Sequence, residues 1–263
     1  KMNELGILTG CYDIYQDVLN PEYKDLVTSY SSQYLPEAYP NDIAIKEDGS
    51  MVQAWPLLRK DGNGYINCVA LCDMLAPKYA RQKIPEDLKT NPFGSRYIDT
   101  TTASVLRECY SISHPMTKTQ SRQARYELLK VSSEENGLVT GSENGMDFCV
   151  PVCDYFSGMM SLYFYRIENA GRNTDTLLET GPSQIYEYQL NEKRRLPLWE
   201  LVYHDCCVAM WIWGDCNNKI YDAWDKRDLF DALYAVPPMY WVNTQEYFDE
   251  NKTQLIKSYK TSS

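Results

Sequence analysis

The chain has 263 residues, of which 44% are hydrophobic, and a formal net charge of −10. This length and apolar content suffice for one large domain with a sizeable core. The acidic balance and the absence of a basic block argue against a nucleic-acid partner, and no apolar run approaches the roughly 18 residues of a membrane span.

Predicted strands alternate with predicted helices along most of the chain. A largely apolar run such as residues 65–72 is typical of a strand buried on both faces. Amphipathic stretches bounded by turn and capping residues indicate the helices. The predicted strands are residues 4–12, 51–58, 65–72, 96–98, 138–140, 198–203 and 237–242. The predicted helices are residues 77–88, 117–132, 224–234 and 244–260.

This alternation favours the α/β class and a (β/α)8 TIM-like barrel, the commonest closed form of a parallel sheet. Turn signals at Asp48-Gly49 and Asp61-Gly62 predict a β-hairpin insertion. About six or seven strands are found rather than eight, and the first begins soon after Lys1. We therefore expect residues 1–263 to form one barrel domain that is incomplete at its N-terminus, as a fragment of a longer multidomain protein.

Two of the predicted strands lead to a single carboxylate. Asp99 follows residues 96–98 and precedes three threonines, and Glu143 follows residues 138–140 between two glycines. Adjacent parallel strands place their ends about 5 Å apart. Two carboxylates at that separation are what retaining cleavage of a glycosidic bond requires. Asp99 is the expected nucleophile, kept ionised by the threonines, and Glu143 is the expected acid/base with a raised pKa.

A plainer interpretation of the same two residues is also open. Asp99 could cap the helix that follows it, and Glu143 could pair with an arginine. Asp73, His204 and Asp205 occupy equivalent positions after predicted strands and are candidates for hydrogen bonds to sugar hydroxyls. The indole rings of Trp211 and Trp213, with Trp199, could form a stacking platform for a sugar ring or belong in part to the core.

The nine cysteines are an odd number, which does not suit a disulfide framework in a protein of this size. Two C-x3-C pairs, Cys68/Cys72 and Cys149/Cys153, raise the alternative of a zinc-dependent hydrolase. However, residues i and i+4 of a strand lie about 13 Å apart. We therefore expect no metal ligands and no cofactor, and most of the cysteines to be small buried hydrophobic residues.

Several runs resemble a group of bacterial (β/α)8-barrel glycoside hydrolases. They are RYIDTTTA (96–103), ECYSISHPMT (108–117), LVTGSENG (138–145), LPLWELVYHD (196–205), WIWGD (211–215) and NNK (217–219). That group is similar to families 129 and 101, the retaining α-N-acetylgalactosaminidases. In those families an Asp at the end of one barrel strand is the nucleophile and a Glu at the end of the next is the acid/base, which implies Asp99 and Glu143 here. Family members also carry flanking β-sandwich domains, which are not recognisable in this sequence.

The resemblance implies cleavage of an α-linked amino sugar, such as an α-N-acetylgalactosaminide, in an oligosaccharide or glycoconjugate. Such a substrate favours a secreted or periplasmic protein, although no signal peptide is visible in this segment. The alternative from a different class is a non-catalytic carbohydrate-binding barrel that keeps the aromatic platform. Carboxyl groups of Asp99 and Glu143 more than about 10 Å apart would favour that alternative.

Overall fold

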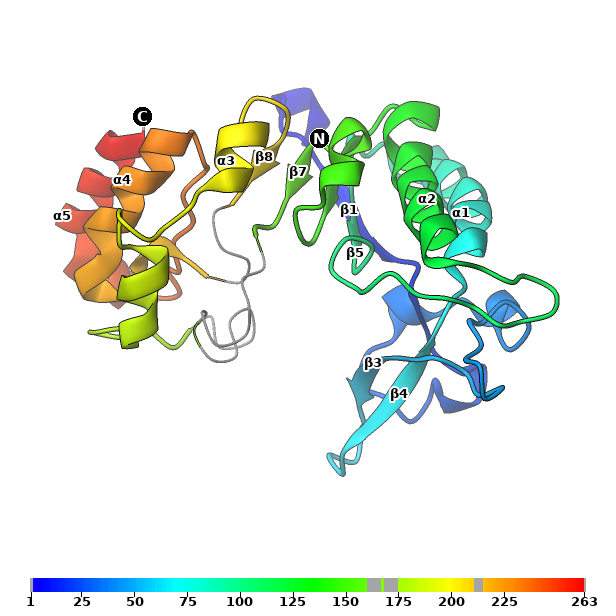
Figure 1. The fold of residues 1–263 in the computed structure, drawn as a ribbon. Coiled ribbons are helices and arrows are strands. Elements are labelled where there is room, and N and C mark those ends of the chain that lie inside the picture. The colour runs from blue at the N-terminus through cyan, green and yellow to red at the C-terminus, as the bar shows by residue number, and fades with distance from the viewer. Residues whose placement is uncertain (1, 160–166, 168–174, 211–214, 263) are drawn as a thin grey trace. The chain divides into compact units, whose positions relative to one another are not determined.

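The computed structural model describes residues 2–159, 167, 175–210 and 215–262. The chain divides into two compact units, Lys1–Asp154 and Tyr155–Ser263, each of which is described here by itself (Figure 1). Trp211 and Trp213, the expected stacking platform, lie outside the described residues. That residues 1–263 act as one catalytic domain remains a prediction.

A parallel sheet with helices forms one half of the first unit. Its strands run in the order β1-β5-β6, and the helices α1 and α2 pack side by side next to it (Figure 1). Buried side chains such as Ile98 of β5 and Leu128 of α2 form the core between them. The bounds are β1 Gly10–Ile14, β5 Ser95–Asp99, β6 Val139–Ser142, α1 Ala76–Thr90 and α2 Lys118–Lys130.

Local signals account for these two helices. Pro77 lies in the first turn of α1, where its missing N–H has no intrahelical partner to lose. Thr117 caps α2 through a capping box, in which its hydroxyl accepts from the N–H of Gln120 at 3.3 Å and the Gln120 side chain reaches back to the Thr117 N–H. Both predicted helices are confirmed, with ends within a few residues.

The first unit also contains a three-stranded antiparallel sheet, in the order β2-β4-β3. The prediction that residues 65–72 supply a strand of the parallel sheet is therefore wrong. Tyr65 is 66% exposed and only the second half of β4 is buried, so this run is not a strand buried on both faces. The antiparallel excursion expected after the first strand is present and is larger than a hairpin. The bounds are β2 Asp17–Val18, β3 Gln53–Leu58 and β4 Tyr65–Ala70.

The second unit pairs two short parallel strands and packs α4 against α5 (Figure 1). Trp224 at the start of α4 is buried, and its indole N–H donates to the hydroxyl of Ser258 in α5 at 2.9 Å. Ser258 in turn donates to Asp228 at 2.5 Å, which fixes the two helices together. The bounds are β7 Tyr155–Phe156, β8 Val208–Ala209, α3 Leu198–Tyr203, α4 Trp224–Tyr234 and α5 Gln245–Ser262.

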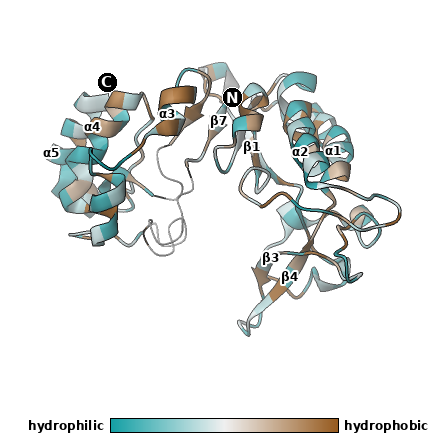
Figure 2. Ribbon diagram, in the orientation of Figure 1, coloured by the Kyte–Doolittle hydropathy of each residue, from teal (hydrophilic) through white to brown (hydrophobic). Residues whose placement is uncertain are grey.

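Two strand predictions in the second unit are wrong. Residues 198–203 form the helix α3, because a short apolar run suits either kind of element and Pro197 directly precedes its first turn. Leu198 and Leu201 remain about 60% exposed, and α3 is visibly hydrophobic in Figure 2. Residues 237–242 have no strand partner among the described residues.

Short 3₁₀ and π helices connect these elements. They are η1 Asn3–Leu5, η2 Pro21–Tyr23, η3 Ser31–Gln33, η4 Pro36–Ala38, η5 Asp73–Leu75, η6 Val131–Glu135, η7 Asp147–Val152, η9 Ile185–Gln189, η10 Asn217–Lys219 and η11 Tyr221–Ala223. No closed barrel is found in the described ranges, so the structure supports an α/β fold with a parallel sheet, and the barrel remains a prediction. None of the described helices is long and apolar enough to cross a membrane.

Candidate active site

The strand register of the parallel sheet brings the two predicted catalytic residues together. Ile98 of β5 pairs with Ser142 of β6, so the next residue on each strand, Asp99 and Glu143, follows at the same end of the sheet. Both side chains are half-buried. The carboxyl group of Glu143 is hydrogen-bonded to that of Asp99. The pair is therefore in direct contact, well below the separation of 10 Å that would favour a non-catalytic barrel.

The electrostatics of this contact distinguish the two carboxyl groups. Burial, the negative charge of Asp99 and the hydrogen bond between them raise the pKa of Glu143 to about 7. Asp99 also accepts a hydrogen bond from the hydroxyl of Tyr12. Glu143 thus holds a proton near neutral pH, while Asp99 accepts hydrogen bonds from both neighbours. A carboxyl group whose pKa is raised to about 7 can donate a proton near neutral pH, as general acid catalysis requires.

A sharp turn follows Asp99. Thr100 lies in the left-handed region with φ of 60°, which is unfavourable for a β-branched residue. The N–H of Thr101 donates to the carbonyl of Asp99 at 2.7 Å, and the N–H of Thr100 donates to the Glu143 carboxyl. The turn therefore contributes a backbone donor to Glu143 as well as ending the strand that carries Asp99.

Hydroxyl groups connect the segment after Asp99 to the segment that carries Glu143. Thr102 is buried and donates to the hydroxyl of Ser142 at 2.9 Å, and Ser142 donates to the carbonyl of Ile98 at 2.6 Å. The N–H of Asn144 completes the connection by donating to the Thr102 hydroxyl at 3.0 Å. Of the three threonines, Thr102 therefore fixes the relative position of the two carboxylate segments.

The end of β1 contributes residues that the sequence did not single out as catalytic. Tyr12 stacks on Tyr97, with ring centroids 5.8 Å apart, which directs its hydroxyl toward Asp99. Gln16 accepts from the Thr101 hydroxyl at 2.8 Å. Asp17 is buried, and burial raises its pKa to about 6. The only sequence signal near this group was the predicted strand at residues 4–12, which did not indicate a site.

Asp17 and Gln16 leave unsatisfied polar atoms at this end of the sheet. Oδ2 of Asp17 and Nε2 of Gln16 are buried and have no hydrogen-bond partner among the described residues. Asp17 is also close enough to Asp99 for their charges to interact. A buried acceptor and a buried donor without partners are what a site for a hydroxylated ligand would present.

Asp73 is buried and is connected through Arg125 to the loop that follows Asp99, instead of facing solvent. Its side chain is buried and accepts from Arg125 Nε at 3.0 Å and from the Ser121 hydroxyl at 2.6 Å. Arg125 then donates to the carbonyls of Thr101, Ser104 and Val105, at 3.2, 2.5 and 2.7 Å. This buried ion pair holds the loop that follows Asp99. The other carboxylate oxygen of Asp73, Oδ1, is buried and has no partner among the described residues, and the sugar contact expected of Asp73 stays a prediction.

His204 and Asp205 belong to the second unit, and their predicted strand-end setting is not found. Both follow the last turn of α3, and both are exposed. Nδ1 of His204 lies 2.7 Å from the Glu200 carbonyl of the same helix. Trp199 packs on Tyr203, with ring centroids 4.7 Å apart, so its ring is part of an aromatic cluster in this unit.

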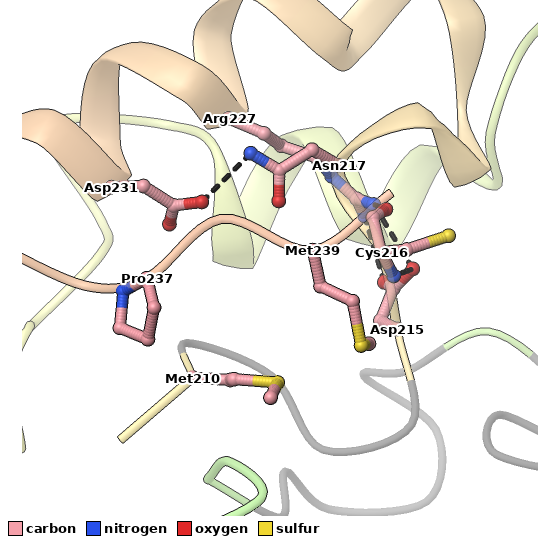
Figure 3. A pocket seen from close by; sticks show the side chains of 8 residues that line it. All are labelled: Met210, Asp215, Cys216, Asn217, Arg227, Asp231, Pro237 and Met239. Atoms are coloured by element: carbon pink, nitrogen blue, oxygen red, sulfur yellow. Dashed lines mark hydrogen bonds and ion pairs between the residues drawn. The ribbon is translucent and has the colours of Figure 1, made fainter. Parts of the chain in front are cut away.

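A small pocket lies in the second unit, and Figure 3 shows that polar and sulfur-containing side chains share its wall. Arg227 forms two hydrogen bonds to Asp215, at 3.0 and 2.9 Å, and Asn217 donates to Asp231 at 2.7 Å. Burial raises the pKa of Asp231 to about 7. None of the predicted site residues that the structure describes lines this pocket. The lining residues are Met210, Asp215, Cys216, Asn217, Arg227, Asp231, Pro237 and Met239.

Comparisons with known proteins identify the family. A family model described as glycosyl hydrolases related to GH101 family, GH129, matches residues 1–176 and 182–262. The ligand-free structure of the alpha-N-acetylgalactosaminidase NagBb from Bifidobacterium bifidum is similar, with a TM-score of 0.66 and 21% identity over 99% of this chain and 36% of that chain. The GalNAc complex of NagBb gives a TM-score of 0.64 and 21% identity over 92% of this chain and 32% of that chain. A search of curated proteins gave no match.

These comparisons differ in what they show. At 21% identity the likeness to NagBb shows a common fold, and this chain spans about a third of the length of those solved chains. The family model, in contrast, matches nearly every residue. The resemblance inferred from the sequence is therefore confirmed, and the chain belongs to the GH129 family of glycosyl hydrolases, which is related to the GH101 family.

Proposed function

We propose that this chain is the catalytic part of a retaining glycoside hydrolase that cleaves α-linked N-acetylgalactosamine, or a closely related amino sugar, from a glycoconjugate. The observation that carries the proposal is the contact between Asp99 and Glu143, in which Glu143 has a pKa of about 7. Family membership supports the reaction class. The choice of N-acetylgalactosamine as the proposed sugar is based on the alpha-N-acetylgalactosaminidase activity named for the structural relative NagBb.

In the first step an oxygen of Asp99 attacks the anomeric carbon while the bond from that carbon to the leaving oxygen breaks. Glu143 transfers its proton to the leaving oxygen, so the aglycone departs as a neutral alcohol. In the second step the Glu143 carboxylate removes a proton from water, whose oxygen attacks the anomeric carbon and releases Asp99. Two inversions at one carbon give net retention.

The separation of the carboxyl groups supports retention over inversion. Inverting enzymes keep about 6.5–9.5 Å between the two groups to admit a water molecule, whereas retaining enzymes keep about 5–5.5 Å. Groups in hydrogen-bond contact need to part only slightly for a glycosidic oxygen to enter between them. The hydrogen bond from the Tyr12 hydroxyl to Oδ2 restrains the Asp99 side chain.

Asp17 and Gln16 are proposed as ligands for the sugar hydroxyls, since each has a buried polar atom without a partner among the described residues. His204, Asp205, Trp211 and Trp213 stay proposed substrate-binding residues. Asp73 is also proposed to position the loop after Asp99 through Arg125.

The test uses an aryl α-N-acetylgalactosaminide with the full chain and with Asp99→Asn, Glu143→Gln and Asp99→Ala. Each variant should lose at least about a thousandfold in kcat, and azide should restore activity to Asp99→Ala by giving the β-glycosyl azide. Proton NMR of the first product should show the α-anomer. The β-anomer would overturn retention, and binding of the sugar without turnover would favour a carbohydrate-binding module.

A further inference from the structure

A second cluster of reactive side chains lies in the first unit, where the segment after Asp99 meets the end of β4. Cys72 follows β4, and Cys109 and His114 come from the segment between β5 and α2. All three are buried, and their sulfur and nitrogen atoms all lie within 4.8 Å of one another. The zinc alternative based on C-x3-C pairs placed Cys72 with Cys68. The structure instead packs Cys68 in a different apolar cluster, with Leu19 and Val27.

Two distances within this cluster are close to the edge of a coordination tetrahedron. Zinc–sulfur and zinc–nitrogen bonds of about 2.3 and 2.05 Å place two tetrahedral ligand atoms roughly 3.6 Å apart. Sγ of Cys109 lies 3.5 Å from Nδ1 of His114. Sγ of Cys72 lies 3.9 Å from Sδ of Met116, which supplies a further soft donor atom. The ligand atoms therefore need little movement to bind a common ion.

Backbone contacts orient the ring and the sulfurs as they do around bound metals. Nε2 of His114 lies 2.9 Å from the carbonyl oxygen of Asn41, which accepts only if Nε2 carries the proton. The lone pair of Nδ1 is then free to face Cys109. The N–H of Ile45 donates to Sγ of Cys109 at 3.3 Å, and Cys72 accepts from the N–H of Met74. Such outer contacts fix the tautomer of a metal-binding histidine and orient the ligand atoms.

We propose that Cys72, Cys109 and His114 bind a thiophilic cation, Zn²⁺ in the first instance, with the Met116 thioether as the nearest fourth donor. Two sulfurs and an imidazole are soft and borderline ligands, which select Zn²⁺ or Cu⁺ over Mg²⁺ and Ca²⁺. On binding, each thiol gives up its proton to solvent and its sulfur forms a bond to the ion, so two protons are released per ion.

The consequence of binding would be structural. Cys109 and Met116 pair with each other through backbone hydrogen bonds of 2.8 and 2.9 Å, closing a short hairpin with Ile112 fully exposed at its tip. An ion held by Cys72 would fasten this hairpin to the end of β4. Since the hairpin belongs to the connection between Asp99 and α2, the ion would restrain the loop that begins at the proposed nucleophile.

Cobalt provides the direct test, because tetrahedral Co²⁺ bound to thiolates absorbs visible light strongly. The full chain, reduced and treated with chelator, is titrated with Co²⁺ and then with Zn²⁺. We expect intense absorption at one equivalent, which Zn²⁺ abolishes. Cys109→Ala and His114→Ala should lose this absorption. Cys68→Ala, which removes a buried cysteine outside the cluster, should retain it.

A mass-spectrometric measurement on the unmodified chain covers the case in which these variants fold poorly. Zn²⁺ should slow alkylation of Cys72 and Cys109 at least tenfold and leave the exposed Cys206 unaffected. Calorimetry in buffers of different ionisation enthalpy should give two protons released per ion. Absence of tetrahedral absorption, equal binding by Cys109→Ala, or recovery of a Cys72–Cys109 disulfide without bound metal would each overturn the proposal.

Discussion

The hydroxyl of Tyr12 on β1 donates a hydrogen bond to Oδ2 of Asp99 on β5. The two residues are far apart in sequence, and parallel pairing of Tyr12 with Tyr97 brings them together, because Asp99 lies two residues after Tyr97 on the same face of the strand. Burial and the charge of Asp99 raise the pKa of Tyr12 well above its usual value, so the hydroxyl remains a donor.

Replacement of Tyr12 by phenylalanine should lower kcat by about 10- to 100-fold. A hydrogen bond to a charged group contributes about 1.5–3 kcal/mol, and here it helps to orient the proposed nucleophile. The measurement is steady-state kinetics on an aryl glycoside. Tyr65→Phe, at a largely exposed tyrosine of β4, is the matched control and should leave kcat unchanged. Equal activity of Tyr12→Phe and wild type would remove Tyr12 from the site.

Replacement of Asp99 by asparagine should lower the pKa of Glu143 from about 7. Burial makes the largest contribution to that pKa and remains in the variant, whereas the negative charge of Asp99, which also raises it, disappears. The new value should therefore lie between 4.5 and 7. Carbon NMR of labelled glutamate side chains measures it, and the signal that disappears in Glu143→Gln gives the assignment. An unchanged pKa would mean that the two carboxyl groups are not in contact.

Glu143 should make the folded chain less stable as the pH rises from about 4.5 to 7. Its pKa is higher in the folded state, so the folded chain holds more protons in this window and the free energy of unfolding falls with rising pH. In the Glu143→Gln variant the side chain at position 143 no longer gains or loses a proton in this pH window. The variant should gain on the order of 2 kcal/mol relative to wild type across the window, after allowance for the partial exposure of the carboxyl group. Urea unfolding at a series of pH values is the measurement, and parallel curves for the two proteins would contradict it.

Replacement of Asp73 by asparagine should destabilise the first unit by about 3–5 kcal/mol, because it leaves the buried Arg125 guanidinium without its counter-charge. Glu135→Gln breaks an ion pair of 2.7 Å to Arg81 that is largely solvent-accessible, and should change stability by less than about 1 kcal/mol. Urea unfolding of the Asp73→Asn and Glu135→Gln variants measures both changes in the free energy of unfolding. If Asp73→Asn instead raises KM and leaves stability intact, Asp73 is a sugar ligand after all.

The parts of the fold that the sequence predicted well are those with strong local signals. The helices around Pro77 and Thr117 have proline and capping residues at their starts, and both form as predicted. The strand at residues 96–98 is bounded by glycine before it and by a strained turn after it, so its carboxylate lies where expected.

The elements and sites that the sequence predicted wrongly or missed depend on contacts between distant segments of the chain. Residues 198–203 are too short and too apolar for periodicity to separate a strand from a helix. Whether residues 65–72 join a parallel or an antiparallel sheet depends on the partner strand, which composition does not encode. Tyr12 and the Cys72 cluster were missed as sites for the same reason, since each is assembled from residues that only the folded chain brings together.

The register between β5 and β6 sets a rule for changes in chain length. The long connection between the two strands can gain or lose residues without moving Asp99 or Glu143, because strand pairing is independent of the length of the crossover. A single residue inserted within β6 would instead turn the Glu143 side chain to the opposite face of the sheet. Relatives of this chain should therefore vary in length around α2 and be free of insertions and deletions within the two strands.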